Sequence, residues 1–190
     1  MECEAEIGRL LSAGDLRSAA EATIRTYGSS VLGLLHRVLG QPELAEDAFS
    51  LFAEQLWSTI GTFQRRSSMR TWSFRLARNA AITVQRESWQ RKRRRLFTTE
   101  AEQIAEDVRT RSALRLEMQS LVVARLAKHF SVDDQTLLSL RIDQRLSWEE
   151  VAEVLSSPGD EVCAPTLRKR FERLTEKLRQ LARDEGLLES

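Results

Sequence analysis

The sequence is poor in residues that break helices and in residues that build metal or disulfide sites. Its 190 residues include three prolines, eight glycines, two cysteines and two histidines. Cys3 and Cys163 stand far apart, and no zinc-ligand spacing surrounds either of them, so we expect two reduced thiols in a cytoplasmic protein. The sequence therefore predicts no disulfide, no metal and no cofactor.

Long apolar runs and enzyme motifs are also missing. The run at 121–124 is among the longest and is far shorter than the ~20 residues that cross a membrane. Glu2, Glu4 and Glu6 stand where a signal peptide has basic residues. There is no Gly-rich phosphate loop, no HExxH and no nucleophile beside a plausible base. We expect a cytoplasmic protein that does not insert into a membrane and is not an enzyme.

What the sequence does have is helical periodicity along nearly its whole length. The apolar spacing predicts helices at 4–12, 15–26, around 31–40, 42–60, 68–90, 114–130, 132–143, 147–155 and 165–184. The pattern is lost between these groups, which indicates a linker. We therefore expect an all-α fold in which two small helical domains, 1–90 and 113–190, are joined by a linker at 91–112.

Charge is segregated along the chain, although its formal net value is only +1. Residues 64–95 hold 11 basic and one acidic side chain, and residues 164–179 hold six basic and two acidic. Residues 1–57 and 96–163 are acidic instead. This distribution indicates contact with a polyanion at two places and an acidic surface for a basic protein partner.

The most informative segment is 63–79, which reads FQRRSSMRTWSFRLARN. Nucleic acids are bound through positive charge for phosphates, polar groups for base edges and flat rings for stacking, and this segment has all three. The sequence therefore predicts a grip on DNA or RNA, including unpaired strands.

The second basic segment has the features of a helix-turn-helix. Ser147 and Glu150 have the spacing of a capping box, and the last helix has an apolar stripe at Leu167, Phe171, Leu174, Leu178 and Leu181. Basic residues gather at the start of that helix, where a major-groove reader contacts bases. A helical hairpin with a solvated basic face fits the pattern equally well, and the loop at 156–164 is longer than the usual turn.

Together these segments resemble the extracytoplasmic-function (ECF) group of bacterial sigma factors. Residues 42–57 resemble the helix that docks on the clamp of core RNA polymerase. Residues 63–79 resemble the pattern FRGxSSFRTWLYRIARN, which melts and reads the −10 promoter element, and residues 137–178 resemble the domain that reads the −35 element. The chain has Ser50 and Leu51 where the family's clamp-binding helix usually has Gln-Glu, and Arg65 where the promoter-loop pattern has Gly.

The resemblance implies two sets of DNA-binding residues. The −10 set is Gln64, Arg65, Arg66, Ser67, Ser68, Arg70, Thr71, Arg75, Arg78 and Asn79, and the −35 set is Thr166, Arg168, Lys169, Arg170 and Arg173. We expect the −10 residues from 70 to 79 to lie along the exposed side of their helix. Trp72 fits either core packing or base stacking, while Phe63 and Phe74 fit the core. The run 91–95 fits either a solvated linker or a DNA contact.

The implied partners are core RNA polymerase and promoter DNA, with an anti-sigma factor as a further expectation, and the free protein is expected to be a monomer. The polymerase-binding residues would be Glu46, Asp47, Ser50 and Glu54, whereas Phe52, Leu56 and Trp57 would lie in the core. Two other functions stay open. A helix-turn-helix regulator would bind duplex DNA without polymerase, and a helical adaptor would bind proteins only.

Overall fold

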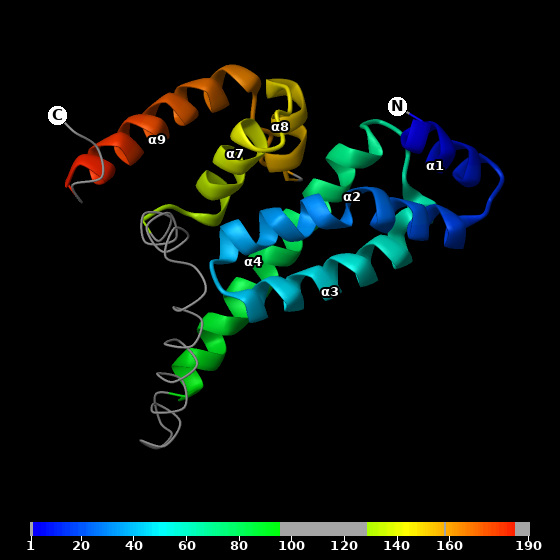
Figure 1. The fold of residues 1–190 in the computed structure, drawn as a ribbon, viewed down its shortest axis with the longest axis horizontal. Coiled ribbons are helices and arrows are strands. Elements are labelled where there is room, and N and C mark those ends of the chain that lie inside the picture. The colour runs from blue at the N-terminus through cyan, green and yellow to red at the C-terminus, as the bar shows by residue number, and fades with distance from the viewer. Residues whose placement is uncertain (1, 96–128, 158, 185–190) are drawn as a thin grey trace.

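A computed structural model describes residues 2–95, 129–157 and 159–184. Within these residues the regular structure is helical, apart from one isolated bridge between Ser157 and Asp160, so the fold is all-α as predicted. In chain order the elements are α1 (Glu2–Ser12), α2 (Leu16–Leu39), α3 (Pro42–Thr59), the 3₁₀ turn η1 (Ile60–Thr62), α4 (Met69–Arg95), α7 (Val132–Ile142), α8 (Trp148–Leu155) and α9 (Ala164–Asp184) (Figure 1).

α2 is one continuous helix, whereas the sequence pattern predicted two. Asp15 caps its start by accepting a hydrogen bond from the Ser18 backbone N–H at 3.1 Å. Gly28 does not end the helix because it is buried against Phe49, whose ring lies 3.5 Å from where a Cβ would stand. The helix ends at Gly40, whose φ of 64° is the left-handed value that favours glycine.

The N-terminal helices α2, α3 and α4 share one core. Leu35, Phe52, Leu56 and Phe74 are all fully buried in it, and each burial of this kind contributes roughly 1.5–3 kcal/mol. The assignment of Trp57 to this core is wrong, because its side chain is 50% exposed. Leu56 takes the inward position at this end of α3, and the next residue along a helix points in a different direction.

α7 and α8 each begin at a capping box. Ser147 Oγ accepts from the Glu150 N–H at 3.2 Å, and the Glu150 carboxylate accepts from the Ser147 N–H at 2.7 Å, which confirms the box predicted there. Ser131 and Asp134 make the same reciprocal pair at α7. Such a cap stabilises a helix by about 1 kcal/mol, which helps to define these two short elements.

The long connection between α8 and α9, residues 156–163, has internal structure of its own. Ser157 and Asp160 exchange backbone hydrogen bonds of 3.1 and 2.9 Å. Gly159 has a φ of 85°, a left-handed conformation that glycine adopts without strain. The Val162 N–H donates to Ser156 Oγ at 3.0 Å. These bonds hold residues 156–157 and 159–162 together in a turn.

α9 packs through the apolar stripe that its sequence predicted. Leu167 and Leu174 are buried, and Phe171, Leu178 and Leu181 are partly buried against the same core. The Phe171 ring meets the Trp148 ring of α8 edge-on at 5.6 Å. The stripe therefore fixes which side of α9 faces outward at its N-terminal end.

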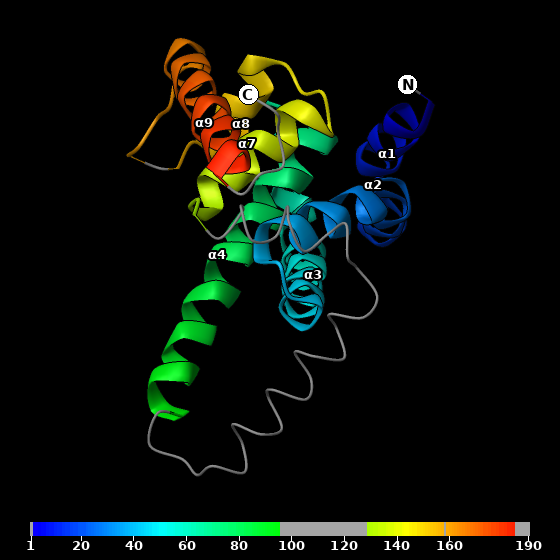
Figure 2. The same cartoon turned by 60° about the vertical axis from the view of Figure 1, so that its left-hand side comes forward.

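The C-terminal helices α7 and α8 lie against α2 and α4 (Figure 2). Arg37 of α2 and Asp143, which follows α7, form an ion pair of 3.1 Å across this contact. α4 extends to Arg95, and its later turns point away from the packed helices. The remainder of the predicted linker at 91–112, and residues 113–128, lie outside the described residues.

No helix in the described ranges is both long enough and apolar enough to span a membrane.

Candidate nucleic-acid interface

The basic loop, residues 63–68 between η1 and α4, places its polar side chains at the surface. The five predicted −10 residues of the loop all lie there, with Gln64, Arg65 and Arg66 exposed and Ser67 and Ser68 half-buried. The loop thus offers two guanidinium groups and three hydrogen-bonding side chains over a few residues, which is the chemistry that phosphates and base edges require.

Arg65 has a backbone conformation that explains why the resembling pattern has glycine there. Its φ is 56°, and this left-handed region costs a residue with a Cβ roughly 1–2 kcal/mol. Its guanidinium Nη2 donates to the Gly8 carbonyl and to Ser12 Oγ, both at 2.7 Å. These two bonds to α1 offset the backbone cost and hold the loop in place.

The start of α4 is fixed from both sides. Ser68 Oγ accepts from the Thr71 N–H at 3.0 Å, as a helix cap does. From α1, Glu4 accepts from the Met69 N–H at 2.6 Å and from the Tyr27 hydroxyl at 3.1 Å. Burial, followed by the Glu4 charge, raises the pKa of Tyr27 to about 12. The beginning of α4 is therefore tied to α1 and α2.

Trp72 belongs to the core rather than to an open stacking surface. Its side chain is 6% exposed, and its ring packs against the half-buried Phe63 ring with centroids 5.1 Å apart. Phe74 is fully buried. The core reading of all three aromatic residues is confirmed, so base stacking on Trp72 does not fit this conformation.

Arg70 and Arg78 are held by groups from α7 and from the connections that follow α7 and α8. Arg78 Nε lies 2.7 Å from Asp133 Oδ1 of α7, and its side chain is only 7% exposed. Its Nη1 also reaches Ser157 Oγ at 3.4 Å. Arg70 Nη2 donates to the Gln144 carbonyl at 2.6 Å. A carboxylate and a backbone carbonyl thus occupy donors that the sequence assigned to DNA.

The expectation that this side of α4 is exposed is therefore wrong for part of the set. Thr71 is 1% exposed and Arg78 is buried, while Arg75 is half-buried and Asn79 is exposed. For Arg78 the physical reason is Asp133 of α7, a partner that no periodicity within α4 could predict. Contact of these residues with DNA stays a prediction.

The start of α9 is more open. Of the five predicted −35 residues, Thr166, Arg168, Lys169 and Arg173 are exposed. Arg170 is the exception, because its Nε and Nη2 both lie 2.7 Å from Asp134 Oδ1 of α7. The exposed cations form a basic surface at the N-terminal end of a helix, as a major-groove reader has. Their contact with DNA is likewise a prediction.

With this geometry in place, the comparison with known families decides the assignment of the N-terminal helices. Residues 23–95 match the family model described as Sigma-70 region 2. They form a sigma-70 region 2 domain. The region 2 domain includes most of α2, all of α3, the basic loop and α4, whereas α1 and α7–α9 lie outside it. It supports a role as an RNA polymerase sigma factor in promoter recognition. No curated protein sequence matches the chain.

The acidic surface of the region 2 domain lies on α3. The predicted polymerase-binding residues Glu46, Asp47, Ser50 and Glu54 are all exposed there. Sequence reasoning missed Trp57 as a surface residue, although it follows Ser50 and Glu54 at helical spacings of seven and three residues and so lies on their side of α3. Tryptophan is enriched at protein interfaces relative to the rest of the surface.

Neither cysteine is paired, and both are exposed. Cys163 stands immediately before α9, where hydrogen bonding with Thr166 lowers the pKa of its thiol. Across the described ranges, no three His, Cys, Asp or Glu side chains come together in a way that could hold a metal ion. The candidate functional groups are therefore the two basic surfaces and the acidic face of α3.

Proposed function

We propose that the protein is an initiation factor of the ECF type. It binds core RNA polymerase and directs it to promoters whose −35 element it reads as duplex and whose −10 element it reads as a melted strand. The observation that carries this proposal is the region 2 domain over residues 23–95, combined with a second exposed basic surface on α9. A factor with both surfaces can contact two promoter elements at once.

Each surface takes one part of the task. The basic loop and α4 hold the unpaired −10 strand, and the exposed residues at the start of α9 enter the major groove of the −35 element. The acidic face of α3 docks on a basic surface of the polymerase clamp. The protein works in the cytoplasm as a monomer when free, and an anti-sigma factor is a further candidate partner.

Strand binding by α4 requires a change of conformation. Arg78 and Arg70 cannot bind phosphates while Asp133 and the Gln144 carbonyl occupy them at 2.7 and 2.6 Å. α7 and α8 must therefore leave α4 before the −10 strand is bound. Docking on core polymerase supplies the free energy for this opening if polymerase binds the open form more tightly than the closed form.

Transcription by core polymerase tests the proposed function. Genomic fragments are transcribed by core polymerase with and without the full chain, and start sites are mapped. We expect new start sites that depend on the chain and share sequence near −10 and −35. A lack of chain-dependent start sites, with polymerase that responds to another initiation factor, would refute the proposal.

One observation favours a second candidate, a regulator that binds duplex DNA without polymerase. The exposed residues Thr166, Arg168 and Lys169 are accessible in the closed conformation, so duplex binding needs no opening. Capture of core polymerase by the immobilised chain separates the two functions. Retention of polymerase supports an initiation factor, and salt-sensitive duplex binding without polymerase retention supports the regulator.

A further inference from the structure

Trp148, the first residue of α8, touches both of the helices beside it. Its ring meets the Phe171 ring of α9 edge-on, with centroids 5.6 Å apart. The guanidinium carbon of Arg141, in the last turn of α7, lies 4.2 Å from the centre of the Trp148 ring. The guanidinium carbon of Arg168 on α9 lies 5.9 Å from the same centre. One indole therefore attracts an arginine from each neighbouring helix.

Arg141 and its surroundings hold the Trp148 ring in place. The Arg141 side chain is half-buried, and its Nη1 donates to the Leu146 carbonyl in the turn between α7 and α8. Its Nε is buried and has no hydrogen-bond acceptor in the described part of the chain. Attraction to the electron-rich ring face offsets part of the cost of burying that charge. The ring is thus a fixed platform rather than a loose surface side chain.

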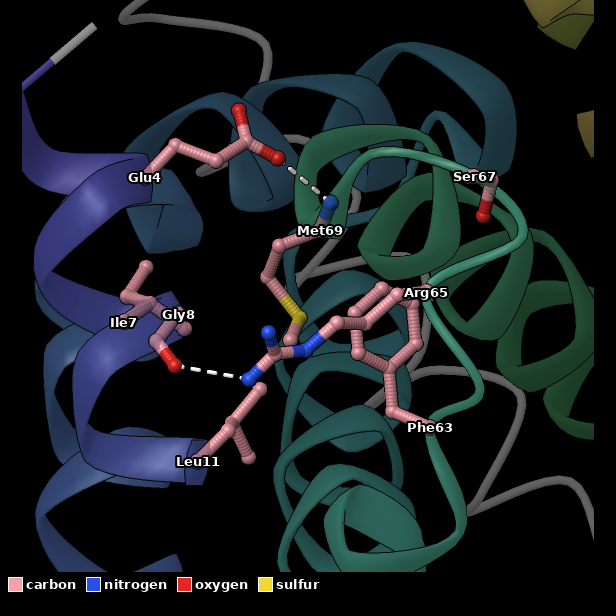
Figure 3. A pocket seen from close by; sticks show the side chains of 8 residues that line it. All are labelled: Glu4, Ile7, Gly8, Leu11, Phe63, Arg65, Ser67 and Met69. Carbon is pink, nitrogen blue, oxygen red and sulfur yellow. Dashed lines mark hydrogen bonds between the residues drawn. The ribbon is translucent and has the colours of Figure 1, made fainter. Parts of the chain in front are cut away.

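Arg168 is held in a different way from the arginine of the basic loop. Figure 3 shows Arg65 donating to the Gly8 carbonyl, a bond of 2.7 Å that occupies one of its N–H groups. Arg168 is exposed, and within the described ranges its guanidinium has no hydrogen-bond or ion-pair partner. Contact with a ring face uses none of the N–H donors of a guanidinium. Trp148 can therefore order Arg168 and leave all its donors available.

The position of Trp148 along α9 suits this task. Arg168 and Phe171 are three residues apart, so they lie on the same side of the helix, and Trp148 contacts both. A bidentate contact with a guanine needs the flat guanidinium in one orientation. Fixing a long side chain on binding lowers affinity, and a side chain that is already ordered loses less. The ring contact therefore favours base reading before DNA arrives.

We propose that Trp148 is a positioning residue for −35 recognition and that it orders the Arg168 guanidinium for contact with a base. The proposal deepens the proposed function and rests on it, because α9 must read the −35 element. It gives a residue of α8, outside the predicted set of −35 residues, a part in sequence selection.

Selection from a randomised −35 element tests the proposal. Duplex promoters from a mapped start site carry random bases at −35 and an unchanged −10 element, and the templates bound by holoenzyme are sequenced. Holoenzymes are made with the natural chain, Trp148→Leu and Trp148→Phe. A further holoenzyme with Arg168→Ala identifies the position that Arg168 reads, because the base preference disappears there.

We expect Trp148→Leu to lower the enrichment of the preferred base at that position roughly two- to fivefold, the effect of one exposed cation–π contact. Preferences at the other −35 positions should change little. Trp148→Phe should retain most of the preference, because a phenyl ring also offers a flat face to a cation. A purely structural role of Trp148 would weaken the preferences at all positions that α9 reads.

A double-mutant cycle shows whether Trp148 acts through Arg168. The measurement is the ratio of holoenzyme binding to promoters with intact and scrambled −35 elements. Trp148→Leu should not lower this ratio further in an Arg168→Ala chain, because the side chain that it orders is gone. It should lower the ratio fully in an Arg173→Ala chain, since Arg173 is an exposed cation of α9 whose Nε donates to the Lys169 carbonyl instead. Equal losses in both chains would overturn the positioning role.

The remaining outcomes separate the two levels of the argument. Thermal unfolding shows which variants are folded, and Trp148→Met replaces a Trp148→Leu that does not fold, because the flexible methionine fills irregular space without a ring. A natural chain that enriches no base at −35 would contradict the proposed reading by α9. A clear preference that is unchanged when the ring is removed would overturn only the role of Trp148.

Discussion

The two basic surfaces of this protein differ in how their arginines are occupied. At the start of α9, Arg168 and Arg173 are exposed, whereas on α4 Arg78 is 7% exposed and bound to Asp133. The sequence makes the two surfaces look alike, since each is a basic stretch on a helix. The difference indicates that charge composition marks a DNA-binding surface, while tertiary packing decides whether it is accessible.

Two neighbouring carboxylates at the start of α7 connect these surfaces. Asp133 binds Arg78 of α4, and Asp134 binds Arg170 of α9, each at 2.7 Å. Asp134 also completes the capping box with Ser131. The same turn of helix thus holds one arginine from each surface, but it closes only the α4 surface, because the other cations of α9 remain exposed.

Arg168→Ala should cause the largest loss of promoter binding. Comparison with other arginines of α9 should show which of them contact the −35 element. Loss of a bidentate contact to a base costs roughly 1–3 kcal/mol of promoter binding. Arg170→Ala should cost less, because Asp134 already holds that side chain. Holoenzyme binding is measured on promoters with intact and scrambled −35 elements. Arg179→Ala, on the same helix but far from its start, is the control for charge. Equal losses for Arg168→Ala and Arg179→Ala would remove the −35 assignment.

Asp133→Asn should weaken the closed conformation and so test the asymmetry directly. Removing this carboxylate frees Arg78, and we expect the free protein to bind a fluorescent single-stranded oligonucleotide about tenfold more tightly, or about 1.4 kcal/mol. Duplex binding through α9 should change little. Glu153 is an exposed residue of α8, so Glu153→Gln is the control for the general effect of losing a negative charge. A similar gain in both variants would contradict the closure of α4.

Gln64→Ala and Ser67→Ala should have a smaller effect, confined to the melted strand. Each loses a hydrogen bond to a base edge, which contributes about 1 kcal/mol. The first step, open-complex formation on duplex promoters, should fall. The second, binding to DNA that offers no unpaired −10 base (a closed duplex, or a pre-melted template with an abasic −10 strand), should stay nearly constant. Permanganate footprinting and filter binding measure the two steps. An equal loss in both steps would indicate phosphate contact in place of base reading.

The smallest expected effect concerns the attachment of α1. Because the pKa of Tyr27 is about 12 in the folded protein and ordinarily 10.0, the folded state retains this proton more strongly than the unfolded state. The resulting stability is fully present below pH 10 and is lost as the pH rises towards 12. Thermal unfolding between pH 9 and pH 12 should therefore be less steep in Tyr27→Phe. Identical pH dependence in both proteins would exclude this linkage.

Much of the fold could be predicted because local patterns determine it. The capping box at Ser147 joins residues three apart, and each apolar residue of the α9 stripe stands three or four residues from the next. The expected break between residues 26 and 31 is wrong for the opposite reason: Gly28, which lies there, is packed against Phe49 of another helix. The prediction that Trp57 is buried is wrong because an apolar residue next to Leu56 in a helix need not point in the same direction.

The candidate site also has a part that local sequence predicts and a part that depends on residues far away in the chain. The exposure of Gln64 and Arg66 follows from a polar loop, and sequence alone predicted it. Arg78 is held by Asp133, which lies 55 residues away in the chain. Periodicity within α4 carries no information on such a partner. The bonds of Glu4 and Arg65 that join α1 to the loop and to α4 could not be predicted either, because their partners are also far away in the chain.

The distance between Cys3 and Cys163 shows whether the α4 surface is closed in the free protein and opens when the protein binds polymerase. Both thiols are exposed and unpaired, with Cys3 in α1 and Cys163 before α9, so they accept a donor and an acceptor dye without any substitution. Energy transfer is measured for the free chain and after addition of core RNA polymerase. We expect efficient transfer in the free chain and a clear fall on binding. Unchanged transfer in a chain that has bound polymerase and initiates transcription would contradict it.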